Sequence, residues 1–186
     1  MGVGCRVSSV TRELFSSFHE SAFHLETRDR YLIEGEQEKS FQSFLRHGVL
    51  PESGPEEQSW LGKVRAWTAA GKRIQRVHVI AHPLSDYLRW ELEMYRRTSQ
   101  AGEDIRIADV GRHPRLRELD TDFWLFDDAM VAVLRYDVDG RLIGSELAPD
   151  PAPFRAHRDL ALARAIRLDD YLAHHDPAAS AGAGRR

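Results

Sequence analysis

The chain has 186 residues, of which 42% are hydrophobic, and its 26 Lys and Arg residues nearly balance 29 Asp and Glu residues, for a net charge of −3. This length and composition fit one folded domain, and the weak charge argues against direct binding to nucleic acid or anionic membranes. The single cysteine, Cys5, excludes an intramolecular disulfide and a multi-thiolate metal site. No stretch reaches the ~20 apolar residues that a membrane span requires, so we expect a cytoplasmic protein with no membrane partner.

The two ends of the sequence lack apolar periodicity, and the last ten residues are mostly Ala, Gly and Ser. We therefore expect disorder over 1–10, a single α/β domain over 11–174 and a disordered tail over 175–186.

Three helices are predicted before the first strand. Apolar residues at three- and four-residue spacings predict helices over 11–27 and 36–47, the second of which ends at Gly48. The third, over 56–70, places Trp60, Val64 and Trp67 on one face.

A β-α-β unit follows. In RIQRVHVIA, residues 73–81, strict alternation puts Val77 and Val79 on one strand face and Arg76 and His78 on the other. Ser85 suits the N-cap of the next helix, and residues 104–109 are predicted to return as a strand parallel to the first.

The remaining sequence predicts a β-meander and a final helix. The apolar runs 123–126 and 130–136 flank a two-Asp turn, and Asp139-Gly140 predicts a further antiparallel strand over 141–147. A helix from Asp150 toward Leu172 is interrupted near Arg167. The expected fold class is α/β: a helical N-terminal region, then β-α-β, an antiparallel meander and a C-terminal helix around one mixed sheet.

Metal binding finds little support in the sequence. His78 and His82 are the best-placed histidine pair, but four residues of strand separate them by about 13 Å, too far for one zinc ion. Four carboxylates could surround Mg²⁺, although Asp is also a preferred turn residue: Asp120, Asp122, Asp127 and Asp128. We prefer the turn interpretation and expect no metal.

Catalytic and nucleotide-binding motifs are absent from the sequence, which has no GxSxG, GxGxxG or GxxxxGK[ST]. We expect no catalytic residue and no cofactor. One weak ligand site remains, because parallel strands place binding residues at their carboxyl ends. Its candidate residues are His82, Ser85, Asp86, Arg89, Asp122, Trp124 and Asp128. The competing interpretation is that Ser85 only caps a helix and Trp124 belongs to the core.

Four segments together resemble a family of unknown function from high-GC soil bacteria, over about residues 12–173: HVIAHPLSDYLRWELEMY, AGEDIRI, DFWLFDD and RDLALARAIRLDDY. Members of that family are commonly encoded beside helix-turn-helix regulators and small companion proteins. The resemblance implies a part in a regulatory module, with such a regulator as partner, and it supplies no catalytic residues.

The order of elements over about 56–172 also resembles one half of the phospholipase D fold. The catalytic signature of that family is HxKxxxxD, in which the His is the nucleophile and the Lys binds phosphate. If Asp127 stands at the Asp of this motif, Asp120 and Asp122 stand at its His and Lys positions. If Asp128 stands there instead, Thr121 and Phe123 occupy those two positions. The resemblance therefore implies a degenerate, non-catalytic relative.

Three functional hypotheses follow. The first is a non-catalytic regulatory or interaction protein that acts with a helix-turn-helix regulator or senses a small effector. The second is a cryptic metal-dependent hydrolase or transferase that uses Asp122 and Asp128. The third is self-association through the first helices, as in a homodimer.

Overall fold

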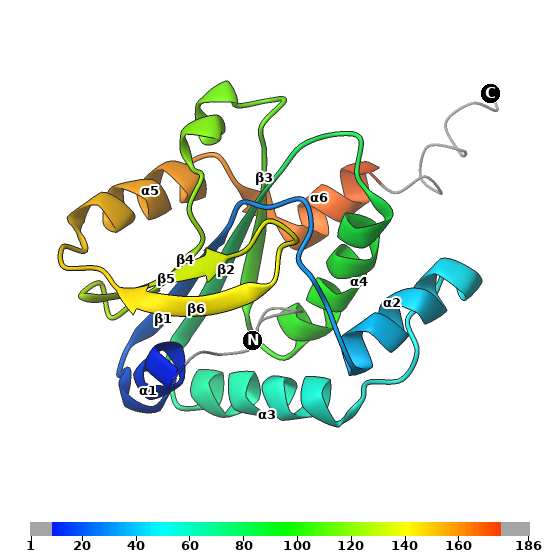
Figure 1. The fold of residues 1–186 in the computed structure, drawn as a ribbon, viewed down its shortest axis with the longest axis horizontal. Helices are drawn as coiled ribbons and strands as arrows, with labels where there is room; N and C mark the ends of the chain where they lie inside the picture. Colours follow the sequence, from blue (N-terminus) through cyan, green and yellow to red (C-terminus); the bar gives the residue numbers. More distant parts are fainter. Residues whose placement is uncertain (1–8, 176–186) are drawn as a thin grey trace.

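The computed structural model of the chain describes residues 9–175, which form a mixed α/β structure (Figure 1). The elements are α1 (Ser9–Ser17), β1 (Ser21–Glu26), α2 (Glu36–His47), α3 (Pro55–Ala69), β2 (Arg73–Ile80), α4 (Asp86–Gln100), β3 (Asp104–Asp109), a 3-10 helix (Pro114–Glu118), β4 (Phe123–Phe126), β5 (Met130–Tyr136), β6 (Leu142–Leu147), α5 (Ala152–Leu162), β7 (Ile166–Arg167) and α6 (Leu168–His175).

All seven strands form one mixed sheet in the order β6-β5-β4-β1-β2-β3-β7. The three strands β1, β2 and β3 are parallel, and every other pairing is antiparallel. The sheet thus combines the predicted β-α-β unit with the predicted meander, and the expected α/β fold class is confirmed.

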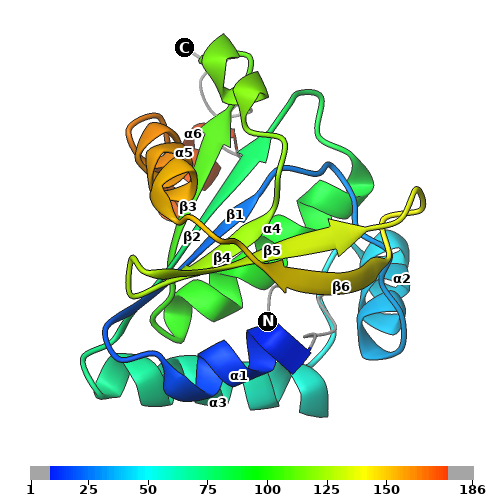
Figure 2. The same cartoon turned by 60° about the vertical axis from the view of Figure 1, so that its left-hand side comes forward.

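Helices cover both faces of the sheet. Figure 2 shows α5 on the opposite side from α1 and α3, and α5 packs on Phe23, Leu25, Val77 and Val79. The other face of the same strands contacts α1, α3, α4 and α6, while α2 packs against α4. The central strands are therefore buried on both sides. None of the helices in residues 9–175 is long and apolar enough to cross a membrane.

The prediction of one helix over 11–27 is wrong. α1 ends at Ser17, and residues 21–26 form the central strand β1, buried at every position between β4 and β2. The apolar residues of this segment fit both a helical spacing and a doubly buried strand, and pairing with two neighbours decides in favour of the strand. Its polar residues His24 and Glu26 then point into the protein interior.

The other predicted elements are confirmed, with ends shifted by a few residues. The interruption expected near Arg167 is the short strand β7, which separates α5 from α6 and pairs with β3. Of the ends expected to be disordered, Ser9 and Val10 belong to α1 and His175 ends α6. The remaining residues of both ends lie outside the part of the chain that the structure describes.

The two-Asp turn between β4 and β5 also anchors the start of β1. Asp127 and Asp128 both adopt the left-handed backbone conformation, with φ of 49° and 55°. The Asp127 carboxylate accepts three backbone hydrogen bonds, of 2.7–2.8 Å, from the N–H groups of His19, Glu20 and Ser21. Partial burial by itself raises the pKa of Asp127, but the three N–H donors together lower it by more, so the net shift is downward.

We expect Asp127→Asn to lower the free energy of unfolding by about 2 kcal/mol at pH 7, because charge-assisted hydrogen bonds to three N–H groups are weakened. Asp128→Asn is the matched control, since the one interaction of its side chain within residues 9–175 is an exposed ion pair with Arg158, worth at most about 1 kcal/mol. Because the pKa of Asp127 is lower in the folded state, its contribution to the free energy of unfolding is fully present when the pH is above the ordinary carboxyl pKa. That contribution is lost as the pH falls through the folded-state pKa. Urea denaturation at pH 7 and near pH 2 measures both effects, and equal losses for the two variants would contradict the assignment.

Candidate functional site

Four polar side chains lie side by side in the middle of the sheet. The register pairs His24 of β1 with Arg76 of β2, and Glu26 with His78, on the face that α4 covers. Each is at most 3% exposed. Because burying polar groups costs free energy unless they are paired, the contacts of these residues define the site.

Arg76 lies between two carboxylates. Its Nη1 donates to Glu26 Oε1 at 2.6 Å and its Nε donates to Glu103 Oε1 at 2.9 Å, while the guanidinium lies 5.1 Å from the Tyr95 ring centre. Burial by itself lowers the pKa of Arg76, but the larger combined effect of Glu103 and Glu26 raises it, so the net pKa is well above its usual value and the guanidinium stays charged. Burial likewise raises the pKa of Glu26, and Arg76 lowers it to about 2. The site therefore contains a fully ionised buried pair.

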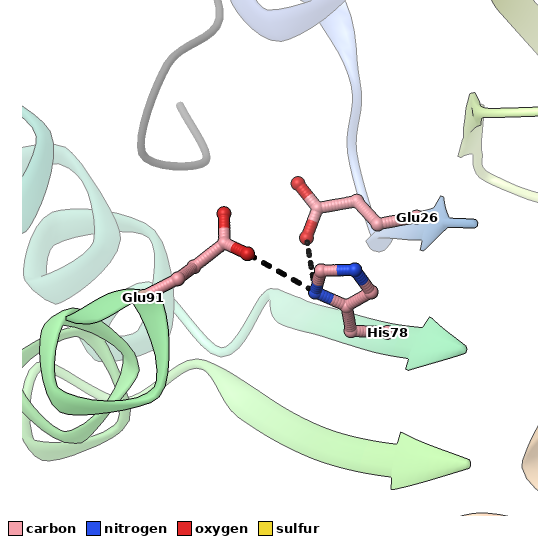
Figure 3. Close-up of side chains that lie close together, drawn as sticks. All are labelled: Glu26, His78 and Glu91. Atoms are coloured by element: carbon pink, nitrogen blue, oxygen red, sulfur yellow. Dashed lines mark ion pairs between the residues drawn. The ribbon is translucent and has the colours of Figure 1, made fainter. Parts of the chain in front are cut away.

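The ring orientation of His78 is fixed by a contact at its Nε2 nitrogen. Its Nε2 lies 3.0 Å from the carbonyl oxygen of Arg28, which can only accept, so in the neutral ring Nε2 carries the proton and Nδ1 keeps a lone pair. Nδ1 faces the Tyr95 hydroxyl at 2.9 Å, Glu91 Oε2 at 3.3 Å and Glu26 Oε2 at 3.7 Å. Figure 3 shows the two carboxylates, from β1 and α4, converging on this nitrogen.

Glu91 is fully buried on the sheet-facing side of α4. Its Oε1 accepts from the Tyr87 hydroxyl at 3.2 Å, whereas Oε2, the oxygen nearest His78, has no hydrogen-bond partner within residues 9–175. Burial raises the pKa of Glu91 well above its usual value, and Glu26 raises it further, so the protonated form is favoured. Oε2 and the His78 lone pair thus face each other at 3.3 Å.

His24 extends the site toward β4. Its ring stacks on Trp124 with 4.1 Å between centroids, and neither ring nitrogen has a hydrogen-bond partner in the described part of the chain. Burial lowers the pKa of His24 well below its usual value, which keeps the ring neutral although Glu26 lies 3.4 Å away.

An open groove with a volume of about 1050 Å³ lies between α2 and α3 and ends against α4. Its lining includes Trp60, Met94 and Thr98, and its rim carries charges of both signs. Met94 is three residues from Glu91 on α4, so the groove and the buried network meet neighbouring residues on the same side of this helix.

The structure disperses the residues of the sequence-predicted ligand site. Ser85 caps α4 by accepting from Leu88 N–H at 3.1 Å, while Asp86 and Arg89 form an exposed pair in the first turn of that helix. His82 is half-exposed beside Tyr171 and Asp109. Trp124 is 1% exposed and belongs to the core. None of these residues lines the groove.

Asp122 and Asp128 are not brought together either, since they flank β4 at opposite ends. Asp122 is buried and accepts hydrogen bonds from the Thr27 N–H, the Thr27 hydroxyl and the Tyr31 hydroxyl. Burial raises the pKa of Asp122, against the effect of these donors. Asp128 lies at the exposed turn and pairs with Arg158.

Sequence reasoning missed Glu26, Glu91 and Glu103. Glu26 was hidden by the helix predicted over 11–27. Glu91 carried a usable signal, because Tyr87, Glu91 and Tyr95 recur at four-residue spacing and so place a carboxylate within an aromatic stripe. A charged residue on a core-facing stripe indicates a buried partner.

The fold and the site together define an α/β protein with one mixed seven-stranded sheet and charged groups buried beneath a helix. The chain belongs to the family described as Domain of unknown function (DUF6879), whose model matches residues 9–173. The match includes every residue of the buried network, and it confirms membership of a family of unknown function. A comparison with curated proteins found no match.

Proposed function

We propose that this chain is a non-catalytic, effector-binding regulatory protein of the cytoplasm, and that its ligand occupies the groove between α2 and α3. The observation that carries the proposal is the groove itself. A volume of about 1050 Å³ is at the upper end of the range in which proteins bind small organic molecules. Its lining combines apolar side chains with a larger number of polar and charged ones.

The lining indicates the chemistry of the ligand. Leu32, Trp60, Met94 and Leu142 supply apolar surface. Several rim charges are already engaged, since Glu34 pairs with Arg141 and Glu57 with Arg97.

Other rim charges are available to a ligand. Lys39, Lys63, Glu52 and Glu56 form no side-chain ion pair within residues 9–175. The lining therefore suits an organic molecule with an apolar body and a charged end.

Two observations favour binding over catalysis. Among the described residues, no groove hydroxyl is hydrogen-bonded to a His, Lys or carboxylate that could activate it, and Ser40 is held between Trp90 and Met94. The separation of Asp122 from Asp128 disfavours the alternative of a hydrolase built on that pair. The resemblance to a phospholipase D half without its motif supports the same conclusion.

Methyl NMR tests the groove directly. The chain has three Met residues, of which Met94 lines the groove and Met130 is exposed on β5. In protein labelled at the methionine methyl groups, we expect octanoate or octylamine to shift the Met94 signal and leave the Met130 signal in place, with octanol binding more weakly than the charged probe. Met130 thus serves as an internal control.

Two matched variants locate the binding. Ser59→Trp fills the groove from α3 and is expected to abolish the Met94 shift, whereas Arg65→Trp, on an exposed position of α3 outside the lining, leaves it unchanged. An unmoved Met94 signal with all three probes, or an equal shift in Ser59→Trp, contradicts the proposal.

The macromolecular partners belong to the same proposal. A helix-turn-helix regulator, implied by the sequence resemblance, and a second copy of the chain are the candidates. Co-expression followed by size-exclusion chromatography measures both, and elution as a monomer in the presence of the regulator argues against them.

A further inference from the structure

We propose that Glu26, His78 and Glu91 form a structural zinc site that ties β1, β2 and α4 together. One nitrogen and two carboxylate oxygens converge here, and all three ligand atoms lie within 4.8 Å of one another. The site is independent of the groove and of the function proposed for it.

The distances fit tetrahedral zinc. Ligands at about 2.1 Å from the ion are separated by roughly 3.4 Å in a tetrahedron. His78 Nδ1 lies 3.3 Å from Glu91 Oε2 and 3.7 Å from Glu26 Oε2. The Tyr95 oxygen, 2.9 Å from Nδ1, is the next donor to the same point. Small movements would therefore suffice to close the ligands around an ion.

The histidine has the support that metal ligands require. Its Nε2 is held by the Arg28 carbonyl at 3.0 Å, which directs the Nδ1 lone pair toward the carboxylates. A backbone carbonyl on the far nitrogen is the usual device that fixes the tautomer and ring orientation of a metal-bound His.

Charge balance supplies an independent reason. Glu26, Glu91 and Glu103 share the buried network with a single cation, Arg76. A metal ion would displace the proton that burial favours on Glu91, and the three ionised carboxylates and Arg76 would then carry an excess of two negative charges, which one divalent ion neutralises. Glu91 Oε2 and Glu103 Oε2 are the two carboxylate oxygens of this network that are buried without a hydrogen-bond partner in the described chain, and Glu91 Oε2 is the one that lies beside His78 Nδ1.

The donor set selects the metal. Imidazole and carboxylate without thiolate disfavour Cu(I), and the imidazole disfavours Mg²⁺ and Ca²⁺, which prefer oxygen ligands alone. Zn²⁺ accepts this mixed set. Because the three side chains are at most 4% exposed, the ion is enclosed, and it acts on stability rather than on a substrate.

The competing occupant is a proton on Glu91, hydrogen-bonded to His78. Glu91→Gln distinguishes zinc from a proton. The amide has nearly the same shape as a protonated carboxyl and also donates a hydrogen bond, but it is a poor zinc ligand. Glu93→Gln, on the outer side of α4, is the matched control.

The experiment uses the full chain, because an enclosed site is loaded during folding. Protein unfolded in chelator and refolded with or without Zn²⁺ is analysed for metal content and thermal stability, and Co²⁺ substitution reports the coordination geometry from its visible spectrum. We expect one zinc per wild-type chain, a melting temperature raised by several degrees over the chelated protein, and the same result for Glu93→Gln.

For Glu91→Gln we expect no bound zinc and a melting temperature that does not respond to it. The proposal is overturned if the wild type refolded with Zn²⁺ contains none, or if Glu91→Gln takes up as much zinc as the wild type. The wild-type measurement decides the question even if Glu91→Gln does not fold.

Discussion

Replacement of Arg76 by Met is expected to lower the free energy of unfolding by about 3–5 kcal/mol, a large part of the about 5–15 kcal/mol that holds an ordinary domain together. Methionine matches the volume of the side chain but leaves Glu26 and Glu103 without their cation. Both carboxylates are at most 3% exposed, so water cannot take over the role of the guanidinium. The cost arises from uncompensated buried charge more than from lost packing.

Arg106→Met is the matched control. Arg106 lies on the neighbouring strand β3, pairs with Asp104 and is partly exposed, so its loss should cost under about 1 kcal/mol. The double variant Arg76→Met with Glu103→Gln should recover part of the stability, since one stranded charge is removed with the cation. Urea denaturation followed by circular dichroism measures all three. Equal costs for Arg76→Met and Arg106→Met would show that the buried pairs contribute no more than surface ones.

The second large effect is expected for Trp124→Ala, at about 3–5 kcal/mol. Trp124 is 1% exposed, and its ring stacks on His24 and meets the edge of Phe15 with 4.8 Å between centroids. Truncation opens a cavity beside His24, a buried histidine whose ring nitrogens have no hydrogen-bond partner within residues 9–175, so the stacking contact is lost with nothing polar to replace it.

Trp67→Ala is the comparison for this prediction, because Trp67 belongs to the same aromatic cluster but is only partly buried on α3. Its cost should be clearly smaller. The prediction also decides a question left open by the sequence, in which Trp124 was either a ligand contact or a core residue. A Trp124→Ala protein with unchanged stability would contradict the core assignment.

The helix α4 connects the two features that the structure brings out. Its Tyr87, Glu91 and Tyr95 side chains face the buried network, and its Met94 and Thr98 side chains line the groove. In our proposals, the network fixes this helix on the sheet, and the groove ends against buried side chains on the same side of the helix, toward its C-terminal end. The zinc measurement and the methyl NMR measurement have separate readouts, so either proposal can fail alone.

Local chemistry along the sequence determined most of the elements. The alternation in 73–81, the Ser85 cap, the stop at Gly48 and the turns at Asp127 and Asp139-Gly140 each depend on neighbours within a few residues. Such signals act before any tertiary contact and can be read directly from the chain. The β-α-β unit and the meander followed from them.

Tertiary structure alone decided the role of residues 21–26 and, with it, the site. SAFHLE has no local feature that separates a helix from a strand buried on both faces, and it becomes β1 because β2 and β4 pair with it. That pairing brings Glu26 to Arg76, 50 residues away, and to His78 and Glu91. The charges that define this interior are set by strand register and helix docking, which depend on contacts between distant parts of the chain and leave no periodic trace in the sequence.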